Sequence, residues 1–117
     1  MGYHVYLFRK EVREQNKDLE FLENDDLILP FTEEQFNKLK ARLLRYGYQV
    51  ETETGDVVTF NYKGGQLGIS VMLSKRQLSF SSSFDQNGIF EISQTASEFV
   101  DEEFSKLDPE DGQWEEN

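Results

Sequence analysis

The chain of 117 residues has no cysteine and a single histidine, His4. Without cysteine it forms no disulfide and offers no thiolate nucleophile and no cysteine-ligated zinc or iron–sulfur centre. Any nucleophilic arrangement of the Ser/His/Asp type would have to use His4. His4 lies in a run of strand-forming residues with no partner at a recognisable spacing, so we expect an ordinary strand histidine.

A long hydrophobic run is also missing. No stretch approaches the roughly 20 apolar residues that a membrane-spanning helix needs. The first ten residues lack the basic start, apolar run and small-residue cleavage site of a signal peptide. Together with the lack of cysteine, these features lead us to expect a cytoplasmic protein that makes no membrane contact.

Positive charge is scarce, with 12 lysines and arginines against 23 acids and a net charge of −11. Such a charge repels phosphate backbones and anionic lipid surfaces, so we expect no nucleic-acid binding. The acidity is concentrated in residues 98–117, which carry nine acids and one base. This segment is either a solvated end that aids solubility or an anionic surface for a basic protein partner.

The clearest element is a helix within residues 31–48, FTEEQFNKLKARLLRYGY. Thr32 and Gln35 have the spacing of a capping box, and Phe31 with Phe36 would form the hydrophobic staple across it. Gly47 suits the left-handed conformation that often ends a helix. Apolar residues at three- and four-residue intervals predict a single buried face, made of Phe36, Leu39, Leu43 and Tyr46.

Several segments predict strands. Residues 3–8 are apolar on both faces and predict a central strand. Residues 11–30 are polar and acidic, and we expect an ordered loop there with a turn of helix around 18–22. Alternating patterns predict antiparallel neighbours that are each buried on a single face, in residues 48–54, 57–62, 67–73 and 78–84.

Residues 85–107 fit two patterns. Asn87-Gly88 is a favoured hairpin turn, and residues 89–92 would then return as a strand. The alternative, which we favour, is a helix that begins between Gly88 and Ala96 and ends near Leu107.

Two local signals accompany that helix. Thr95 and Glu98 have a second capping-box spacing. Asp108-Pro109 would stop the helix, and residues 113–115 would add a short edge strand.

The predicted architecture is a single α+β domain, residues 1–117, with an acidic C-terminal segment, 108–117, that frays. It is a two-layer sandwich of a mainly antiparallel four- to five-stranded sheet with two helices on one face. The other face of the sheet would be polar and open, lined by Thr59, Asn61, Ser70, Met72, Ser79, Ser81 and Ser83.

Motifs for catalysis, metal or cofactor binding are not recognisable. The serines at 79–83 lack the Gly-x-Ser-x-Gly turn of a nucleophile elbow, and Gly64-Gly65 lacks the following helix of a phosphate loop. The acids of residues 108–115 lack the ligand spacing of an EF-hand. We therefore assign no catalytic residue, metal or cofactor.

The two ends of the chain carry a resemblance. Met1-Gly2-Tyr3-His4-Val5-Tyr6-Leu7-Phe8 and Leu107-Asp108-Pro109-Glu110-Asp111-Gly112-Gln113-Trp114 look like the ends of a group of small uncharacterised bacterial proteins. That group begins with a Ser-Tyr-Asp-hydrophobic strand and ends with an Asp-Pro-Gln-x-Gly turn, so this chain departs from it at His4 and Glu110. The group resembles the immunity proteins found beside bacterial toxins, small and often acidic α+β domains that occlude a toxin. No functional residue carries over.

We therefore expect a non-enzymatic protein-binding module of the inhibitor or immunity type, which presents acidic surface to a basic partner. The residues expected to bind the partner are Glu98, Asp101, Glu102, Asp108, Glu110, Asp111 and Trp114. The helix within residues 31–48 would form an opposite, positive pole through Lys38, Lys40, Arg42 and Arg45.

Two alternatives stay open. The first is a small-ligand-binding or hydrolase domain with a pocket between helices and sheet. The second is a homodimeric structural domain joined through the open sheet face. Exposed aromatic side chains often anchor interfaces, and Tyr3, Tyr62 and Trp114 are the first candidates.

Overall fold

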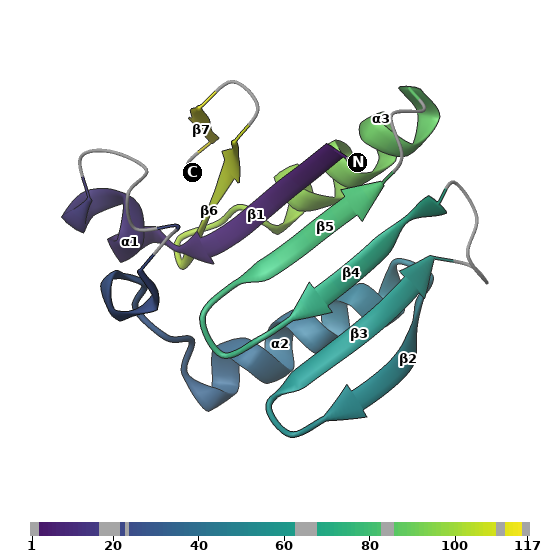
Figure 1. Cartoon of the computed structure of the whole chain (residues 1–117), viewed down its shortest axis with the longest axis horizontal. Helices are drawn as coiled ribbons and strands as arrows, with labels where there is room; N and C mark the ends of the chain where they lie inside the picture. Colours follow the sequence, from purple (N-terminus) through teal and green to yellow (C-terminus); the bar gives the residue numbers. More distant parts are fainter. Residues whose placement is uncertain are drawn as a thin grey trace.

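A computed structural model describes residues 3–16, 22, 24–62, 68–82, 86–109 and 112–115. It is an α+β fold in which three helices pack against one seven-stranded antiparallel sheet (Figure 1). The strands are ordered β2-β3-β4-β5-β1-β6-β7. The elements are β1 (Tyr3–Arg9), α1 (Lys10–Gln15), the 3-10 turn η2 (Asp25–Leu27), α2 (Glu33–Arg45), β2 (Tyr48–Thr54), β3 (Val57–Tyr62), β4 (Ser70–Leu73), β5 (Leu78–Ser82), α3 (Gln86–Phe99), β6 (Phe104–Asp108) and β7 (Gln113–Glu115).

The first strand lies inside the sheet, as its pattern predicts. β1 pairs antiparallel with β5 on one side and with β6 on the other. Val5 and Leu7 face one layer and Phe8 faces the other, and all three side chains are fully buried. Both faces of the strand are covered at its Phe8 end, whereas His4 on the second face is exposed.

The main core lies between the sheet and the helices α2 and α3. Leu39 and Leu43 of α2 and Ile92, Ala96 and Phe99 of α3 are fully buried against the inner face of the sheet. That face is formed by the alternate residues of the strands, including Val58, Phe60, Val71, Leu73, Leu78 and Phe80. Burial of this kind stabilises a fold by roughly 25 cal/mol for each Å² of apolar surface.

The opposite face is covered at one end, so the prediction of helices on one face only is wrong. Val12 of α1 and Ile28 after η2 form a second core with Phe8 and Leu107. α1 lies in the segment that we expected to be a loop. The helix has six residues and buries only Val12 against the sheet, so its sequence shows no apolar repeat that would predict a helix. The predicted turn at 18–22 lies almost wholly outside the described residues.

The rest of this face is open and polar, as predicted. The exposed or half-buried side chains there include six without formal charge, Thr59, Asn61, Ser70, Met72, Ser79 and Ser81. Ser83 lies outside the described residues.

The helix α2 begins and ends as its sequence predicts. The Gln35 backbone N–H donates to the Thr32 hydroxyl at 3.1 Å, and the Thr32 N–H donates to the Gln35 side chain at 2.9 Å. At the other end Gly47 takes a φ of 94°, which a side chain would disfavour. Both ends therefore have the predicted caps.

The helix α3 differs from its prediction. It begins at Gln86 and ends at Phe99, and Phe104–Asp108 is the strand β6. The hairpin alternative is wrong as well, and Thr95 is not a cap, because it lies inside α3 and donates to Glu91 at 3.3 Å. The apolar residues of β6 are buried on both faces and happen to continue the helical stripe, so periodicity could not separate strand from helix.

β6 and the predicted edge strand β7 bring the sheet to seven strands rather than four or five. Within the acidic segment 108–117, Gln113–Glu115 pairs with β6. None of the helices in the described part of the chain is long and apolar enough to cross a membrane.

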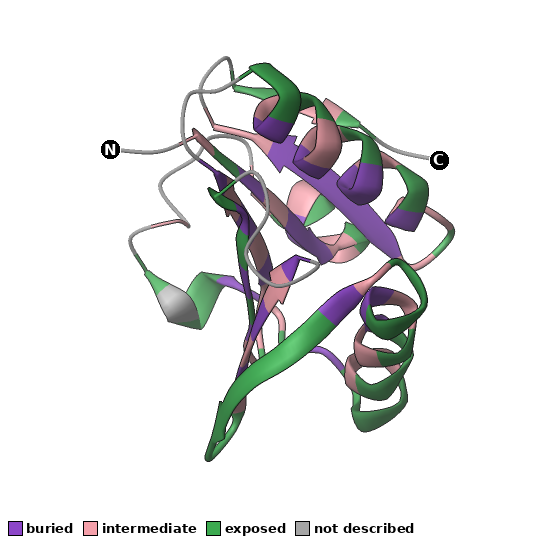
Figure 2. Ribbon diagram, turned by 90° about the vertical axis from the view of Figure 1, so that its right-hand side faces the viewer, coloured by how far each residue is buried: buried purple, intermediate pink, exposed green. Residues whose placement is uncertain are grey.

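The edge strand β2 also differs from its prediction. Its bounds are as expected, but only Tyr48 is buried and the six residues that follow are exposed (Figure 2). β2 therefore extends past the core as the outer strand of a ribbon with β3.

Candidate functional site

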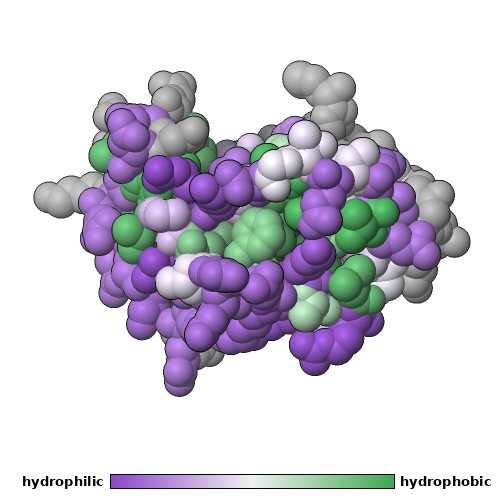
Figure 3. Space-filling model, turned by 90° about the horizontal axis from the view of Figure 1, so that it is seen from below, coloured by the Kyte–Doolittle hydropathy of each residue, from purple (hydrophilic) through white to green (hydrophobic). Residues whose placement is uncertain are grey.

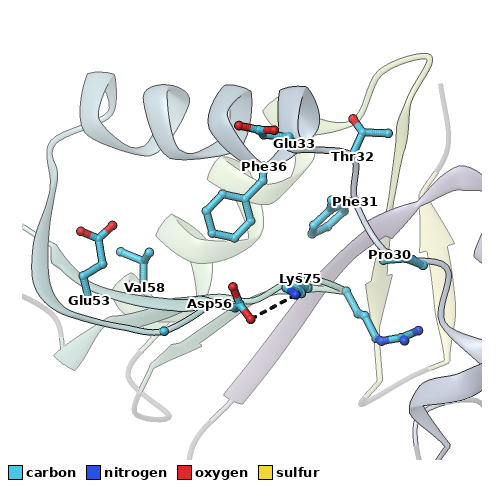
Figure 4. A pocket seen from close by; sticks show the side chains of 11 residues that line it. Pro30, Phe31, Thr32, Glu33, Phe36, Glu53, Asp56, Val58 and Lys75 are labelled. Carbon is cyan, nitrogen blue, oxygen red and sulfur yellow. Dashed lines mark ion pairs between the residues drawn. The ribbon is translucent and has the colours of Figure 1, made fainter.

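A cleft of about 650 Å³ opens between the first turn of α2 and two hairpin turns of the sheet (Figure 4). The turns are the β2–β3 turn at Gly55-Asp56 and the β4–β5 turn at Lys75-Arg76. We call this the α2 cleft. Its lining residues are Pro30, Phe31, Thr32, Glu33, Phe36, Glu53, Gly55, Asp56, Val58, Lys75 and Arg76.

Backbone and side-chain hydrogen bonds hold the walls of the cleft together. The Phe31 N–H donates to the Lys75 carbonyl at 2.7 Å, which fixes the entry of α2 to the β4–β5 turn. The Arg76 guanidinium donates to the Ile28 carbonyl and joins the same turn to the segment before α2. Gly55, with a φ of 59°, allows the tight β2–β3 turn on the other side.

The floor of the cleft is apolar. The rings of Phe31 and Phe36 both point into it from the start of α2, and Val58 lies below them on β3 (Figure 4). Phe31 is only 9 % exposed and packs edge-on against Phe104 at 5.7 Å between ring centroids. Phe36 is half-buried and therefore offers ring surface to a ligand.

The rim of the cleft is charged. Lys75 Nζ lies 3.1 Å from Asp56 Oδ2 and bridges the two hairpin turns. Glu53 accepts from Lys40 at 2.8 Å, and Glu33 stands in the first turn of α2, where the helix dipole favours an acid. Three acids and two bases thus surround an aromatic floor, an arrangement suited to binding an amphipathic group.

The histidine lies elsewhere. His4 is exposed on the open face of the sheet, where its ring stacks on Tyr6 at 6.5 Å. None of the described residues that line the α2 cleft is a histidine or a serine. In the described part of the chain no three His, Asp or Glu side chains gather as a metal site would require.

The acidic residues predicted to bind a partner are not gathered in the α2 cleft. Asp101 follows α3 and binds Arg42 at 2.7 Å and Lys38 at 3.5 Å. Glu98 is exposed on α3, and its hydrogen bond with the Tyr46 hydroxyl raises the pKa of that tyrosine. Glu102 is exposed in the turn after α3. The acids nearest α2 are thus engaged within the chain.

The remaining predicted residues lie at the far edge of the sheet. Asp108 accepts from the Tyr3 hydroxyl, and the half-buried Trp114 packs against Phe8 with 6.1 Å between ring centroids. Glu110 and Asp111 lie outside the described residues. Partner binding by these seven residues stays a prediction.

In the part of the chain that the structure describes, the two predicted poles of opposite charge meet, because Lys38 and Arg42 pair with acids that follow α3. Lys38 binds Glu103 at 3.0 Å and Asp101 at 3.5 Å, so the basic side of α2 faces the acidic turn after α3. These ion pairs of Lys38 join residues that are more than 60 positions apart in the sequence, so a local sequence pattern cannot reveal them.

The exposed aromatic anchor also differs from prediction. Tyr62 is buried, and Tyr3 and Trp114 are half-buried. Phe90 on α3 is instead 69 % exposed.

A buried lysine forms a polar cluster that sequence reasoning missed. Lys106 is 8 % exposed, and its ammonium donates to Ser93 Oγ and Ser97 Oγ at 2.9 Å and to the Ser93 carbonyl at 3.2 Å. A serine beside a lysine also occurs in hydrolases, where the lysine takes the serine proton. Here the carbonyl and the Glu115 carboxylate, 3.5 Å away, stabilise the charged ammonium. The cluster therefore joins β6 to α3.

Comparison of the chain with protein-family models, with curated proteins and with solved structures finds no match.

Proposed function

We propose that this chain is a non-enzymatic protein-binding domain, of the inhibitor or immunity type, and that the α2 cleft receives a side chain of its partner. The observation that carries the proposal is the half-buried Phe36 ring in an apolar floor surrounded by charged side chains. Protein interfaces have this anatomy, with an apolar centre and a polar rim.

The overall charge indicates the kind of partner. A net charge of −11 attracts basic proteins and speeds their association, while it repels acidic ones. The rim of the cleft adds three acids to two bases. A partner that presents an apolar side chain within a basic surface fits both features.

The test compares a half-buried phenylalanine inside the cleft with an exposed one outside it. The chain, tagged and immobilised, is used to capture partners from a lysate of the organism that encodes it, alongside the variants Phe36→Ser and Phe90→Ser. Phe90 is more exposed than Phe36 but lies on α3, outside the cleft. We expect one protein to be captured by the wild type and by Phe90→Ser and to be lost with Phe36→Ser. Equal capture by Phe36→Ser would contradict the role of the cleft.

A second candidate function is small-ligand binding, because the volume of the cleft falls in the range of roughly 300–1,000 Å³ that such sites occupy. An NMR screen of small aromatic cations distinguishes small-ligand binding from protein binding. Tight binding of one compound, with shifts confined to the cleft, would favour a ligand site over a protein interface.

A further inference from the structure

The strand β2 forms a long open edge of the sheet. Among the residues that the structure describes, it pairs only with β3, and six of its seven residues are exposed. The edge at the other end, β7, has only three residues. An open edge presents unpaired backbone N–H and C=O groups to any extended chain that reaches it.

Apolar side chains line this edge. Val50 is 43 % exposed, and its partner in β3 is Phe60, so it faces the layer that contains α2. On α2, Lys40 reaches β2 by its ion pair with Glu53, and Leu44 lies one turn further on the same side of the helix. Leu44 is 49 % exposed. The view in Figure 3 shows hydrophobic patches on this side of the molecule among hydrophilic side chains.

The charge of β2 selects its partner. The strand carries Glu51 and Glu53 and no base, and a bulge interrupts its pairing with β3 between Val50 and Thr52. Two copies of the chain joined at β2 would bring these acids together while each copy carries −11. Acids and bulges on an edge prevent such self-pairing, but a basic segment turns the same charges into an attraction.

We infer that an extended basic segment of the partner adds to β2 as a further strand, with apolar side chains on Val50 and Leu44 and basic ones beside Glu51. Glu53 belongs to both β2 and the rim of the α2 cleft, so one segment can occupy the edge and the cleft together. This inference rests on the proposed function, because it describes how the same partner binds.

The test uses a defined peptide, acetyl-Lys-Val-Lys-Val-Lys-Thr-Lys-amide, titrated into the ¹⁵N-labelled chain. We expect shifts and slower amide exchange in Tyr48–Thr54, and weaker binding as the salt rises from about 50 to about 300 mM. The same peptide N-methylated at alternate residues keeps its side chains but loses backbone donors, and we expect it not to bind. A version with glutamate in place of lysine should not bind either.

Two variants with the same change of charge test whether the peptide lies beside Glu51 on β2. Glu51→Lys should weaken binding of the basic peptide at least about tenfold, while Glu14→Lys, the same charge change on α1, should change it less than about twofold. Equal binding of the N-methylated peptide, shifts that leave the β2 amides unchanged, or no binding at all would overturn strand addition. In each of those cases, capture of a partner that depends on Phe36 would leave the proposed function intact.

Discussion

The Arg42 guanidinium donates to the Asp101 carboxylate at 2.7 Å and to the Phe99 carbonyl at 3.2 Å. Partial burial raises the pKa of Asp101. The hydrogen bonds from Arg42 and from the Glu103 backbone, together with the charges of Arg42 and Lys38, lower this pKa by more than burial raises it. The net pKa lies below its usual value. Folded Asp101 therefore binds a proton more weakly than unfolded Asp101 does.

We predict that Asp101→Asn lowers the free energy of unfolding at neutral pH by about 1–2 kcal/mol. The difference from the wild type is complete well above the ordinary pKa of 3.8 and shrinks as the pH falls through the lower folded pKa. Urea denaturation across acidic pH measures it. Glu102→Gln, the same change at an exposed acid, should cost less than about 0.5 kcal/mol. A difference in free energy of unfolding between wild type and Asp101→Asn that stays constant with pH would contradict the prediction.

Lys106 provides a second prediction. Its replacement by methionine keeps the apolar stem but removes the donor to Ser93 and Ser97, and we expect a loss of about 1–3 kcal/mol. Lys40→Met, which breaks the more exposed pair with Glu53, should cost less than about 1 kcal/mol. Denaturant midpoints give the free energy of unfolding of the two variants. Equal losses would show that the buried cluster stabilises the fold no more than the exposed ion pair does.

Tyr48 makes the fold sensitive to alkali. Burial raises its pKa to about 12 from 10.0, so the unfolded chain releases the phenolic proton at lower pH than the folded chain. The stabilisation is complete below pH 10 and is lost as the pH rises towards 12. Over this range the wild type should lose roughly 3 kcal/mol of its free energy of unfolding, and Tyr48→Phe should remove this part of the alkaline dependence. Parallel stability curves for the variant and the wild type would refute the prediction.

Leu43 and Leu44 are neighbours with different surroundings. Leu43 is fully buried and Leu44 is 49 % exposed. Leu43→Ala should therefore cost about 2–5 kcal/mol, and Leu44→Ala less than about 0.5 kcal/mol. Thermal unfolding tests both, and strand addition requires in addition that Leu44→Ala weakens binding of the basic peptide.

Elements fixed by neighbouring residues could be predicted from the sequence. The cap formed by Thr32 and Gln35, the turn at Gly47 and the alternating burial of Val58, Phe60 and Tyr62 all depend on short-range patterns. Such patterns are present in full within a few residues, so the sequence alone suffices.

Features made by distant segments could not be predicted. Phe104–Asp108 becomes a strand because β1 has a second edge to pair, and α1 buries a single residue, Val12. The α2 cleft likewise combines Phe36, Asp56 and Lys75 from three separate segments. The pair Phe31 and Phe36 was visible, but as a helix staple, and nothing local indicated that it would form the floor of a cleft.

The place of β1 in the sheet has a consequence for synthesis of the chain. Val5 pairs with Phe80, and Phe8 pairs with Ser105, so the partners of β1 are made long after it. The strands β2 to β5 can pair with close neighbours as they emerge from the ribosome, but β1 has to wait as an unpaired apolar segment. Pairing between segments so far apart in sequence is intrinsically slow, because the loop between them must close first. The apolar side chains of β1 therefore stay unpaired longer than those of β2 to β5.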